Sequence, residues 1–352
     1  MNNNQNTAPV LEKAGDTSVE NFSSEVPMKE LFQNCFDQGK KVMFPEGMTT
    51  FRLNCQDDCF VPPVHAQYHF RKGLLRSILA FLRRPHGDAL YLTGPTGSGK
   101  TSLITEIFGR LNWPLQVFTC TETFEFNQLR GNWLYQTKPG QTAPEMVFQP
   151  GPLLTAMKEG HGLLINEADI APAGEMSGLN DVIEGRPLLV PETKELIKPH
   201  PLFRLIVTAN SKGCGDETGA YAGIQQQNIA ALDRYRFLEV GYPEEAVEVD
   251  LLTGIFSESL GPEAKRIAEQ FVQLANKLRA QFVGNENANG EGTIAVPMST
   301  RTLTRWAYLT QDYCGRPRDA LYEALLNRCS AADKEAINSI AAAIFGEQWD
   351  VA

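Results

Sequence analysis

The chain has 352 residues, 42% of them hydrophobic, and a formal net charge of −10. This length predicts two or three domains with buried cores, and no apolar run is long enough to span a membrane. The acidic balance disfavours a broad nucleic-acid footprint and favours protein partners. Because the seven cysteines form no dense, even framework, we expect a reducing compartment and a cytoplasmic protein.

The N-terminal segment, residues 1–25, is polar and lacks both a basic leader and an apolar stretch. It is therefore predicted to be a disordered tail and not a targeting signal. Turn-forming residues are frequent in the next segment, residues 26–63, which is predicted to be a small N-terminal module.

Four zinc-capable side chains lie at the end of this module and just beyond it. Cys55, Cys59, His65 and His69 give the spacing C-x3-C-x5-H-x3-H. The central gap is shorter than the roughly 12 residues of a zinc-finger pattern. We favour packing of Cys59 in the module over metal binding, and zinc remains the alternative.

Residues 64–242 show the pattern of an α/β domain. An amphipathic helix is predicted in residues 71–84, where leucines and isoleucine form one apolar stripe. Short apolar runs then alternate with helical patterns, which predicts a parallel sheet inside an αβα sandwich. Strand signals stop after Gly241, and amphipathic helices predict an all-helical domain at residues 243–352. The five predicted strands are residues 89–94, 115–121, 162–167, 202–210 and 236–242.

The motif GPTGSGKT follows the first of these strands and precedes a predicted helix, which is the context of a phosphate-binding loop. Its glycines let backbone N–H groups face phosphates, Lys100 can reach the β- and γ-phosphates, and Thr101 can offer its hydroxyl to magnesium. ATP and Mg²⁺ are therefore the predicted cofactors. The predicted cofactor-binding residues are Gly94, Pro95, Thr96, Gly97, Ser98, Gly99, Lys100 and Thr101.

A second acidic site is predicted where the strand of the sequence LLINEAD ends. Glu167 is placed to polarise an attacking water, although a helix-capping carboxylate is the alternative. Asn166 stands where P-loop ATPases normally carry Asp. Its amide oxygen can accept a hydrogen bond from Thr101 or from a magnesium-bound water, but it carries no charge. Because charge-assisted hydrogen bonds are roughly twice as strong as neutral ones, we expect Thr101 and Asn166 to form a weakened metal site.

Further polar residues follow in an ordered series. Asn210 ends the strand LIVTAN and suits a residue that orients water near the γ-phosphate, with a turn asparagine as the alternative. Arg234 and Arg236 border the last strand, and Arg301 begins a helix of the second domain. The fixed charge and planar guanidinium of arginine suit phosphate contact. Each arginine taken alone is more often a surface residue, so the interpretation depends on their order along the chain.

That order resembles the AAA+ ATPases of the MoxR-like branch. Residues 129–157 resemble the helix-2 insert of this branch with its PGP helix start, and residues 182–210 resemble its hairpin before the first sensor strand. The stretches KPHPLFRLIVTAN, LDRYRF and MSTRT are similar to the CobS-like subunits of aerobic cobaltochelatases. The resemblance covers about residues 26–350 and implies an AAA+ αβα core with a five-stranded parallel sheet, followed by a helical lid domain.

Carried over by position, the resemblance makes Lys100 and Thr101 the Walker A ligands and Glu167 the catalytic glutamate. Asn166 departs from the Asp of the family. Asp169 cannot be its substitute, because the family has an acid at that position as well. Full-strength turnover is therefore the property that the departure puts in doubt.

The same carry-over assigns roles to the residues outside the two Walker motifs. It makes Asn210 the first sensor, Arg234 the arginine finger acting on the nucleotide of a neighbour, and Arg301 the second sensor acting in cis. Family members form rings, usually hexamers, beside a CobT-like partner with a von Willebrand A domain. A homo-oligomeric ring with such a partner is thus implied.

Three functions remain open from the sequence. The first is a ring-forming ATPase that remodels or activates a partner protein complex. The second is a nucleic-acid-processing motor, since related hairpin-bearing rings thread nucleic acid; the acidic charge disfavours it. The third is a nucleotide-gated scaffold with weak hydrolysis, for which Asn166 is the motivation.

Overall fold

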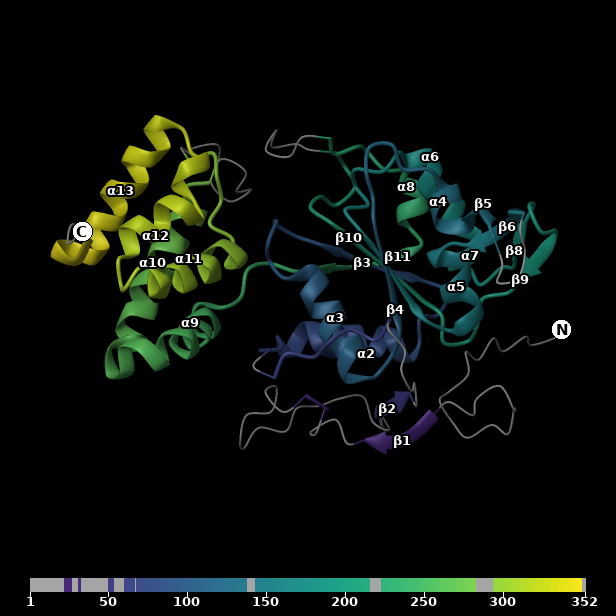
Figure 1. The fold of residues 1–352 in the computed structure, drawn as a ribbon, viewed down its shortest axis with the longest axis horizontal. Coiled ribbons are helices and arrows are strands. Elements are labelled where there is room, and N and C mark those ends of the chain that lie inside the picture. Colours follow the sequence, from purple (N-terminus) through teal and green to yellow (C-terminus); the bar gives the residue numbers. More distant parts are fainter. Residues whose placement is uncertain are drawn as a thin grey trace. The chain divides into compact units, whose positions relative to one another are not determined.

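The computed structural model divides the chain into two compact units (Figure 1). The first comprises residues 1–93, 100–215 and 223–239, and the second comprises residues 94–99, 216–222 and 240–352. The residues that the structure describes are 22–26, 31–32, 50–53, 60–66, 68–137, 143–215, 223–282 and 294–349.

A five-stranded sheet with the order β11-β3-β10-β7-β4 forms the centre of the first unit (Figure 1). All neighbouring strands are parallel. Every residue of β3 and β10 is buried, as expected for continuous apolar strands covered on both faces. The predicted α/β fold class is confirmed. The strands are β3 (Ala89–Thr93), β4 (Leu115–Thr119), β7 (Gly162–Asn166), β10 (Arg204–Ala209) and β11 (Tyr235–Glu239).

Helices cover the sheet because parallel strands need crossover connections. In Figure 1, α2 and α3 lie on one side of the sheet, and α4, α6 and α8 lie on the other. The apolar stripe of α2 is buried, as its helical spacing predicts. The helices are α2 (Lys72–Arg83), α3 (Lys100–Arg110), α4 (Phe126–Arg130), α5 (Pro152–Glu159), α6 (Ala173–Met176), α7 (Asn180–Ile183) and α8 (Ile229–Leu232), with the 3-10 turn η2 (Ser177–Leu179).

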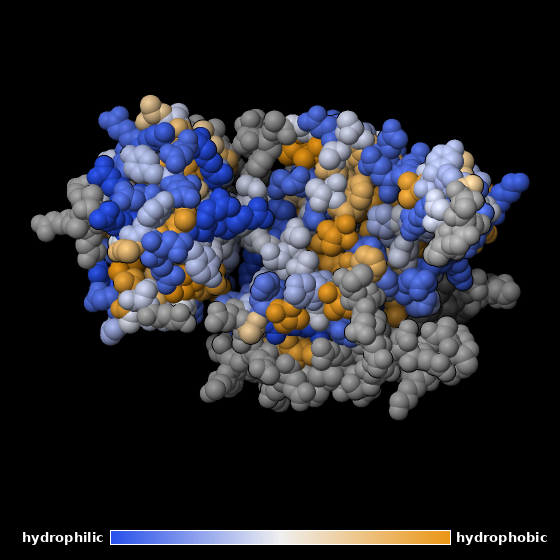
Figure 2. Space-filling view, in the orientation of Figure 1, coloured by the Kyte–Doolittle hydropathy of each residue, from blue (hydrophilic) through white to orange (hydrophobic). Residues whose placement is uncertain are grey.

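Two antiparallel hairpins interrupt the α/β pattern. Strands β5 (Gly131–Gln136) and β6 (Glu145–Pro150) pair within the segment that resembles the helix-2 insert. Strands β8 (Leu188–Val190) and β9 (Glu195–Ile197) pair before β10. Both hairpins expose large apolar side chains, including Tyr135 at 74%. Figure 2 shows one face of the protein, where hydrophobic residues form separate areas among hydrophilic ones.

The N-terminal part contains one antiparallel pair, β1 (Phe22–Val26) with β2 (Thr50–Leu53). Strand β1 begins inside the segment 1–25 that composition predicts to be disordered. Local polarity does not detect this strand because its partner lies far along the chain. Residues 1–21 and most of the module predicted at 26–63 lie outside the described residues.

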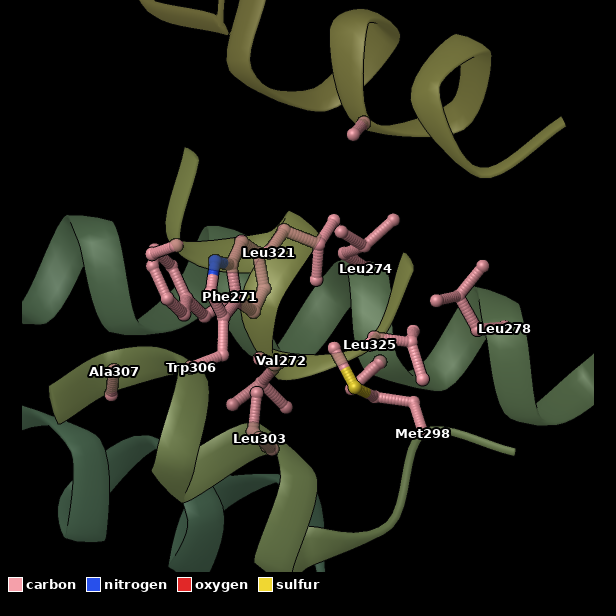
Figure 3. Packing of buried hydrophobic residues seen from close by; sticks show 14 of the residues in the cluster. Phe271, Val272, Leu274, Leu278, Met298, Leu303, Trp306, Ala307, Leu321 and Leu325 are labelled. Atoms are coloured by element: carbon pink, nitrogen blue, oxygen red, sulfur yellow. The ribbon is translucent and has the colours of Figure 1, made fainter. Parts of the chain in front are cut away.

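The second unit is helical in its C-terminal part, which confirms the predicted change after the sheet. Its core contains a stacked aromatic pair: the Phe271 and Trp306 rings have centroids 3.7 Å apart, and both are fully buried (Figure 3). None of the helices in the described ranges could cross a bilayer. The helices are α9 (Glu245–Leu260), α10 (Ala264–Ala280), α11 (Thr300–Asp312), α12 (Pro317–Ala324) and α13 (Ala331–Phe345), with the 3-10 turns η3 (Gly261–Glu263), η5 (Leu326–Arg328) and η6 (Gly346–Trp349).

Candidate functional site

Four predicted site residues meet at the carboxyl edge of the sheet. Asn166 ends β7 and Asn210 directly follows β10, while Lys100 and Thr101 open the helix that comes after β3. Strands β3, β10 and β7 are neighbours in the parallel sheet. Their carboxyl ends therefore lie at the same edge of the sheet, which is the edge where ligands bind in open α/β sheets.

The amide oxygen of Asn166 accepts two hydroxyl hydrogen bonds. Thr101 Oγ1 donates to Asn166 Oδ1 at 2.8 Å, and Thr208 Oγ1 donates to the same atom at 3.0 Å. An amide oxygen has two lone pairs, so both are used. Because the Thr101 hydroxyl donates its proton to Asn166, its own lone pairs are left for another group.

The ammonium group of Lys100 contacts Asn210. Lys100 Nζ donates to Asn210 Oδ1 at 3.0 Å, and the lysine is only 9% exposed. A buried ammonium is costly without acceptors, so this hydrogen bond holds Lys100 at the sheet edge. The structure thus places the predicted phosphate-binding lysine and the predicted first sensor in direct contact.

Asp169 fixes the loop that carries Asn210, a role that the sequence did not indicate. Its carboxylate is fully buried, and Oδ2 accepts the backbone N–H groups of Asn210 at 2.8 Å and Ser211 at 2.9 Å. Hydrogen bonds to a charged acceptor are the strong ones. The other oxygen, Oδ1, has no hydrogen-bond partner in the described part of the chain. The signal in the sequence was an acid two residues after Glu167.

Glu167 lies at the same edge in an unusual backbone conformation. Its φ is +55°, in the left-handed region, and its side chain is exposed. This region costs a non-glycine residue about 1–2 kcal/mol. The turn is held by hydrogen bonds from Ala168 N to Thr208 O and from Ile170 N to Glu167 O. Strain of this kind is typical of functional sites.

Two buried groups beside this edge stay protonated at neutral pH. Burial raises the pKa of the Cys120 thiol to about 12, and the charges of Asp169 and Glu167 add to the effect. Burial likewise raises the pKa of the Tyr91 hydroxyl above its ordinary value, again with a contribution from Asp169. Cys120 is therefore a poor nucleophile, since thiolates are the reactive species.

The glycine-rich loop groups with the second unit. Gly94, Gly97 and Gly99 have φ values of +146°, +68° and +91°. A Cβ on Gly94 would lie 2.3 Å from the carbonyl oxygen of Val240, and one on Gly97 would lie 2.5 Å from Ser299. The loop therefore needs glycine for both its backbone conformation and its close packing.

Arg301 is the second residue of α11 and lies next to this loop. Its Cβ lies 3.7 Å from a Cβ built on Gly97, and its side chain is exposed. The helix starts at this point because the Ser299 hydroxyl caps it by accepting the backbone N–H of Thr302 at 3.1 Å. The predicted second sensor and the glycine loop thus lie together in the second unit.

The two arginines of LDRYRF, Arg234 and Arg236, have different hydrogen-bond partners in the structure. Arg236 donates from Nε to Asp88 at 2.6 Å and from Nη2 to the Pro85 carbonyl at 2.6 Å, and it also covers the Phe81 ring. Arg234 donates to Glu184 at 2.7 Å and to the Ala230 carbonyl at 2.6 Å. These contacts hold Arg236 against the segment that precedes β3.

Two of the four candidate zinc ligands lie within the described residues, His65 and His69. Cys55 and Cys59 lie outside them. The described residues hold no group of three or more His, Cys, Asp or Glu side chains able to bind a metal ion. The backbone of His65 contacts α3, where it donates to the buried Glu106 at 2.8 Å. The zinc alternative stays untested.

Comparison with known families decides the classification. Residues 89–223 match the model of the AAA domain (dynein-related subfamily), and residues 257–345 match that of the CbbQ/NirQ/NorQ C-terminal domain. The chain belongs to the MoxR-like AAA+ ATPases. The first match contains the predicted phosphate-binding loop, Glu167 and Asn210, and the second contains Arg301.

Three curated proteins illustrate the range of relatives. The aerobic cobaltochelatase subunit CobS of Sinorhizobium sp. is 29% identical over 79% of this chain and 80% of its own length. An uncharacterized protein of Staphylococcus haemolyticus is 31% identical over 54% of this chain and 68% of its own. Midasin of Giardia intestinalis is 30% identical over 62% of this chain but only 4% of its own. The AAA+ module is thus shared by proteins of very different size.

Asp169→Asn should loosen the loop after β10. A neutral acceptor replaces a charged one, so we expect hydrogen–deuterium exchange at the Asn210 and Ser211 amides to become about fivefold to tenfold faster. Mass spectrometry with fragment-level resolution measures this. Asp181→Asn, at an exposed ion pair with Arg186, is the control. Unchanged exchange at both amides would show that Asp169 does not fix the loop.

Proposed function

We propose that this AAA+ protein forms a ring that couples ATP binding and hydrolysis to the remodelling or activation of a partner protein complex. The observation that carries the proposal is the pairing of Lys100 with Asn210 and of Thr101 with Asn166 at one sheet edge. These contacts join the elements that bind and sense a nucleotide in P-loop proteins.

The residues present fit ATP with magnesium. The loop from Gly94 to Gly99 has the open backbone that phosphate binding requires, and Lys100 supplies the positive charge at the start of α3. Thr101 has hydroxyl lone pairs oriented by its bond to Asn166. A magnesium ion held there would neutralise charge on the β- and γ-phosphates. Asn166 would affect the magnesium ion through Thr101, because its Oδ1 atom already accepts hydrogen bonds from Thr101 and Thr208.

Hydrolysis is assigned to Glu167 and Asn210. Glu167 is an exposed carboxylate at the sheet edge and accepts a proton from water, which makes it the general base. Asn210 is fixed through its backbone by Asp169 and through its side chain by Lys100, so it is suited to orient that water. Arg301, beside the glycine loop, is assigned to the γ-phosphate in the same subunit.

Arg234 is assigned as the arginine finger that completes the site of a neighbouring subunit. Arg236 is the less suitable candidate because Asp88 and two backbone carbonyls hold it within its own sheet. Arg234 is paired with Glu184, whose carboxylate can keep the guanidinium oriented until a neighbour binds. This assignment requires a homo-oligomeric ring, for which a hexamer is the expected size.

A protein with a von Willebrand A domain is the proposed partner. The support is the likeness to the cobaltochelatase subunit and the acidic charge of the chain, which favours protein over nucleic acid. A nucleotide-gated scaffold is the second candidate, because the neutral Asn166 leaves no free carboxylate oxygen for the metal. Stimulation of turnover by DNA would instead indicate a nucleic-acid motor.

Glu167→Gln should abolish ATP turnover while ATP binding stays nearly intact, because the amide cannot take a proton from water. Lys100→Ala should remove binding itself, since it deletes the cation of the loop. Isothermal titration calorimetry and phosphate release measure the two properties. Binding by Lys100→Ala at the wild-type level would refute the P-loop assignment, and loss of binding in Glu167→Gln would assign this residue to the metal.

Asn166→Asp should lower the magnesium concentration needed for half-maximal turnover. The substitution keeps one oxygen for Thr101 and Thr208 and adds a second, charged oxygen in place of the amide nitrogen. Turnover as a function of magnesium concentration measures the change. If both proteins require the same magnesium concentration, Asn166 does not weaken the metal site. If the wild type binds ATP without turnover and Asn166→Asp hydrolyses it, the scaffold function is favoured.

Arg234→Ala should lose turnover and keep ATP affinity, and its action should be in trans. An arginine finger is worth roughly 10³–10⁵ in rate in well-studied GTPases. Mixing Arg234→Ala with Lys100→Ala subunits pairs an intact pocket with an intact finger, so some turnover should return. Arg236→Ala is the matched control. No recovery in rings shown to be mixed would indicate a cis or structural role.

A further inference from the structure

The second unit contains a buried ion pair that no predicted role explains. Arg279 of α10 meets Glu248 of α9 with two parallel contacts, Nη1 to Oε2 at 2.7 Å and Nη2 to Oε1 at 2.8 Å. The two side chains are 11% and 1% exposed. Bidentate pairs of this kind fix the geometry as well as the distance between two groups.

The pair also holds the start of α11. Arg279 Nε donates to the Met298 carbonyl at 2.7 Å, and Thr300 Oγ1 donates to Glu248 Oε1 at 2.6 Å. Met298 and Thr300 flank the capping residue of the helix, and the Met298 side chain is anchored in the apolar core (Figure 3). The residue after Thr300 is Arg301, so its backbone is fixed by contacts on both sides of the cap.

The same arginine contacts the residues that hold the glycine loop. Its guanidinium lies 4.2 Å from the centre of the Tyr242 ring, and the Tyr242 hydroxyl donates to the Thr96 carbonyl at 3.2 Å. Cation–π contacts are strongest where the cation is shielded from water. Tyr242, Arg279 and Glu248 therefore form a continuous path from the glycine loop to the start of α11.

Core stability alone does not account for this pair. Removing two charges from water is costly, and apolar residues of similar volume often serve equally well in a core. The neighbouring interior of the unit is built from aromatic and aliphatic side chains such as Phe271 and Trp306. The pair instead contacts both the Tyr242 ring and the start of α11.

We propose that Glu248 and Arg279 are positioning residues that set the glycine loop and Arg301 in register for the phosphates of the nucleotide. The proposal rests on ATP binding as proposed above and deepens it. Neither residue is assigned a direct contact with the nucleotide. Their effect passes through Tyr242 to the Thr96 carbonyl and through Met298 and Thr300 to the backbone of Arg301.

The double substitution Glu248→Met with Arg279→Met separates positioning from stability. Two apolar side chains of similar length fill the space, so the thermal unfolding midpoint should stay close to that of the wild type. The contacts to Tyr242, Met298 and Thr300 are lost, and we expect the Kd for AMP-PNP with magnesium to rise about tenfold. Isothermal titration calorimetry measures this Kd. Arg266→Met, which removes an exposed pair between Arg266 of α10 and Glu263 of η3, is the control and should leave the Kd unchanged.

A double-mutant cycle with Arg301→Ala tests whether the pair acts through Arg301. In the wild type this substitution should raise the Kd. In the double-methionine background it should add little, because Arg301 is then already displaced from its position toward the phosphates. Fully additive effects would overturn the proposal and leave the pair a purely structural role. So would a wild-type Kd in the double-methionine variant.

Two milder substitutions decide the matter if the double-methionine variant does not fold. Tyr242→Phe and Thr300→Val each delete one hydroxyl of the path and keep the shape of the side chain, so each should raise the Kd about threefold. Wild-type affinity in both would overturn the proposal. Absence of AMP-PNP binding in the wild type would instead refute the proposed function, so the two failures are distinguishable.

Discussion

The hydrogen bond from Thr101 to Asn166 depends on the order of strands in one parallel sheet. Strand β10 lies between β3 and β7, so Asn210 at its end lies between the groups at the ends of the other two. The contacts of Lys100 with Asn210 and of Asn166 with Thr208 follow from that order. A different order of these strands would separate the residues assigned to ATP binding from those assigned to hydrolysis.

Asn166 changes the chemistry of this edge more than its shape. Its oxygen accepts both threonine hydroxyls as a carboxylate oxygen would, so Thr101 keeps its orientation. The second oxygen of an aspartate is replaced by an amide nitrogen, which donates hydrogen bonds and cannot bind a cation. The buried acid Asp169 accepts hydrogen bonds from the backbone of Asn210 and Ser211. The residues assigned to hydrolysis are thus kept in place while the negative charge for the metal is reduced.

The second unit combines an apolar interior with a polar path along one side. Phe271 and Trp306 stack at its centre, whereas Arg279 and Glu248 connect the start of α11 to Tyr242. An apolar contact tolerates small shifts of the groups it joins, but a bidentate ion pair fixes distance and angle together. This difference suits the proposed role of the pair, in which the glycine loop and Arg301 contact the same nucleotide.

Local patterns determined much of this protein from the sequence alone. The period of apolar residues gave the strands and the amphipathic helices, and the spacing of GPTGSGKT gave the loop, because both depend on neighbours along the chain. Tertiary structure decided what depends on distant partners: the pairing of β1 with β2, the hydrogen bonds of Asp169 to residues 41 and 42 positions away, and the pairing of Glu248 with Arg279 31 positions away. It also distinguished Arg236 from Arg234, since only the folded sheet brings Asp88 to the former. A carboxylate looks the same in a sequence whether it binds metal, water or backbone, and only its position in the fold selects the partner.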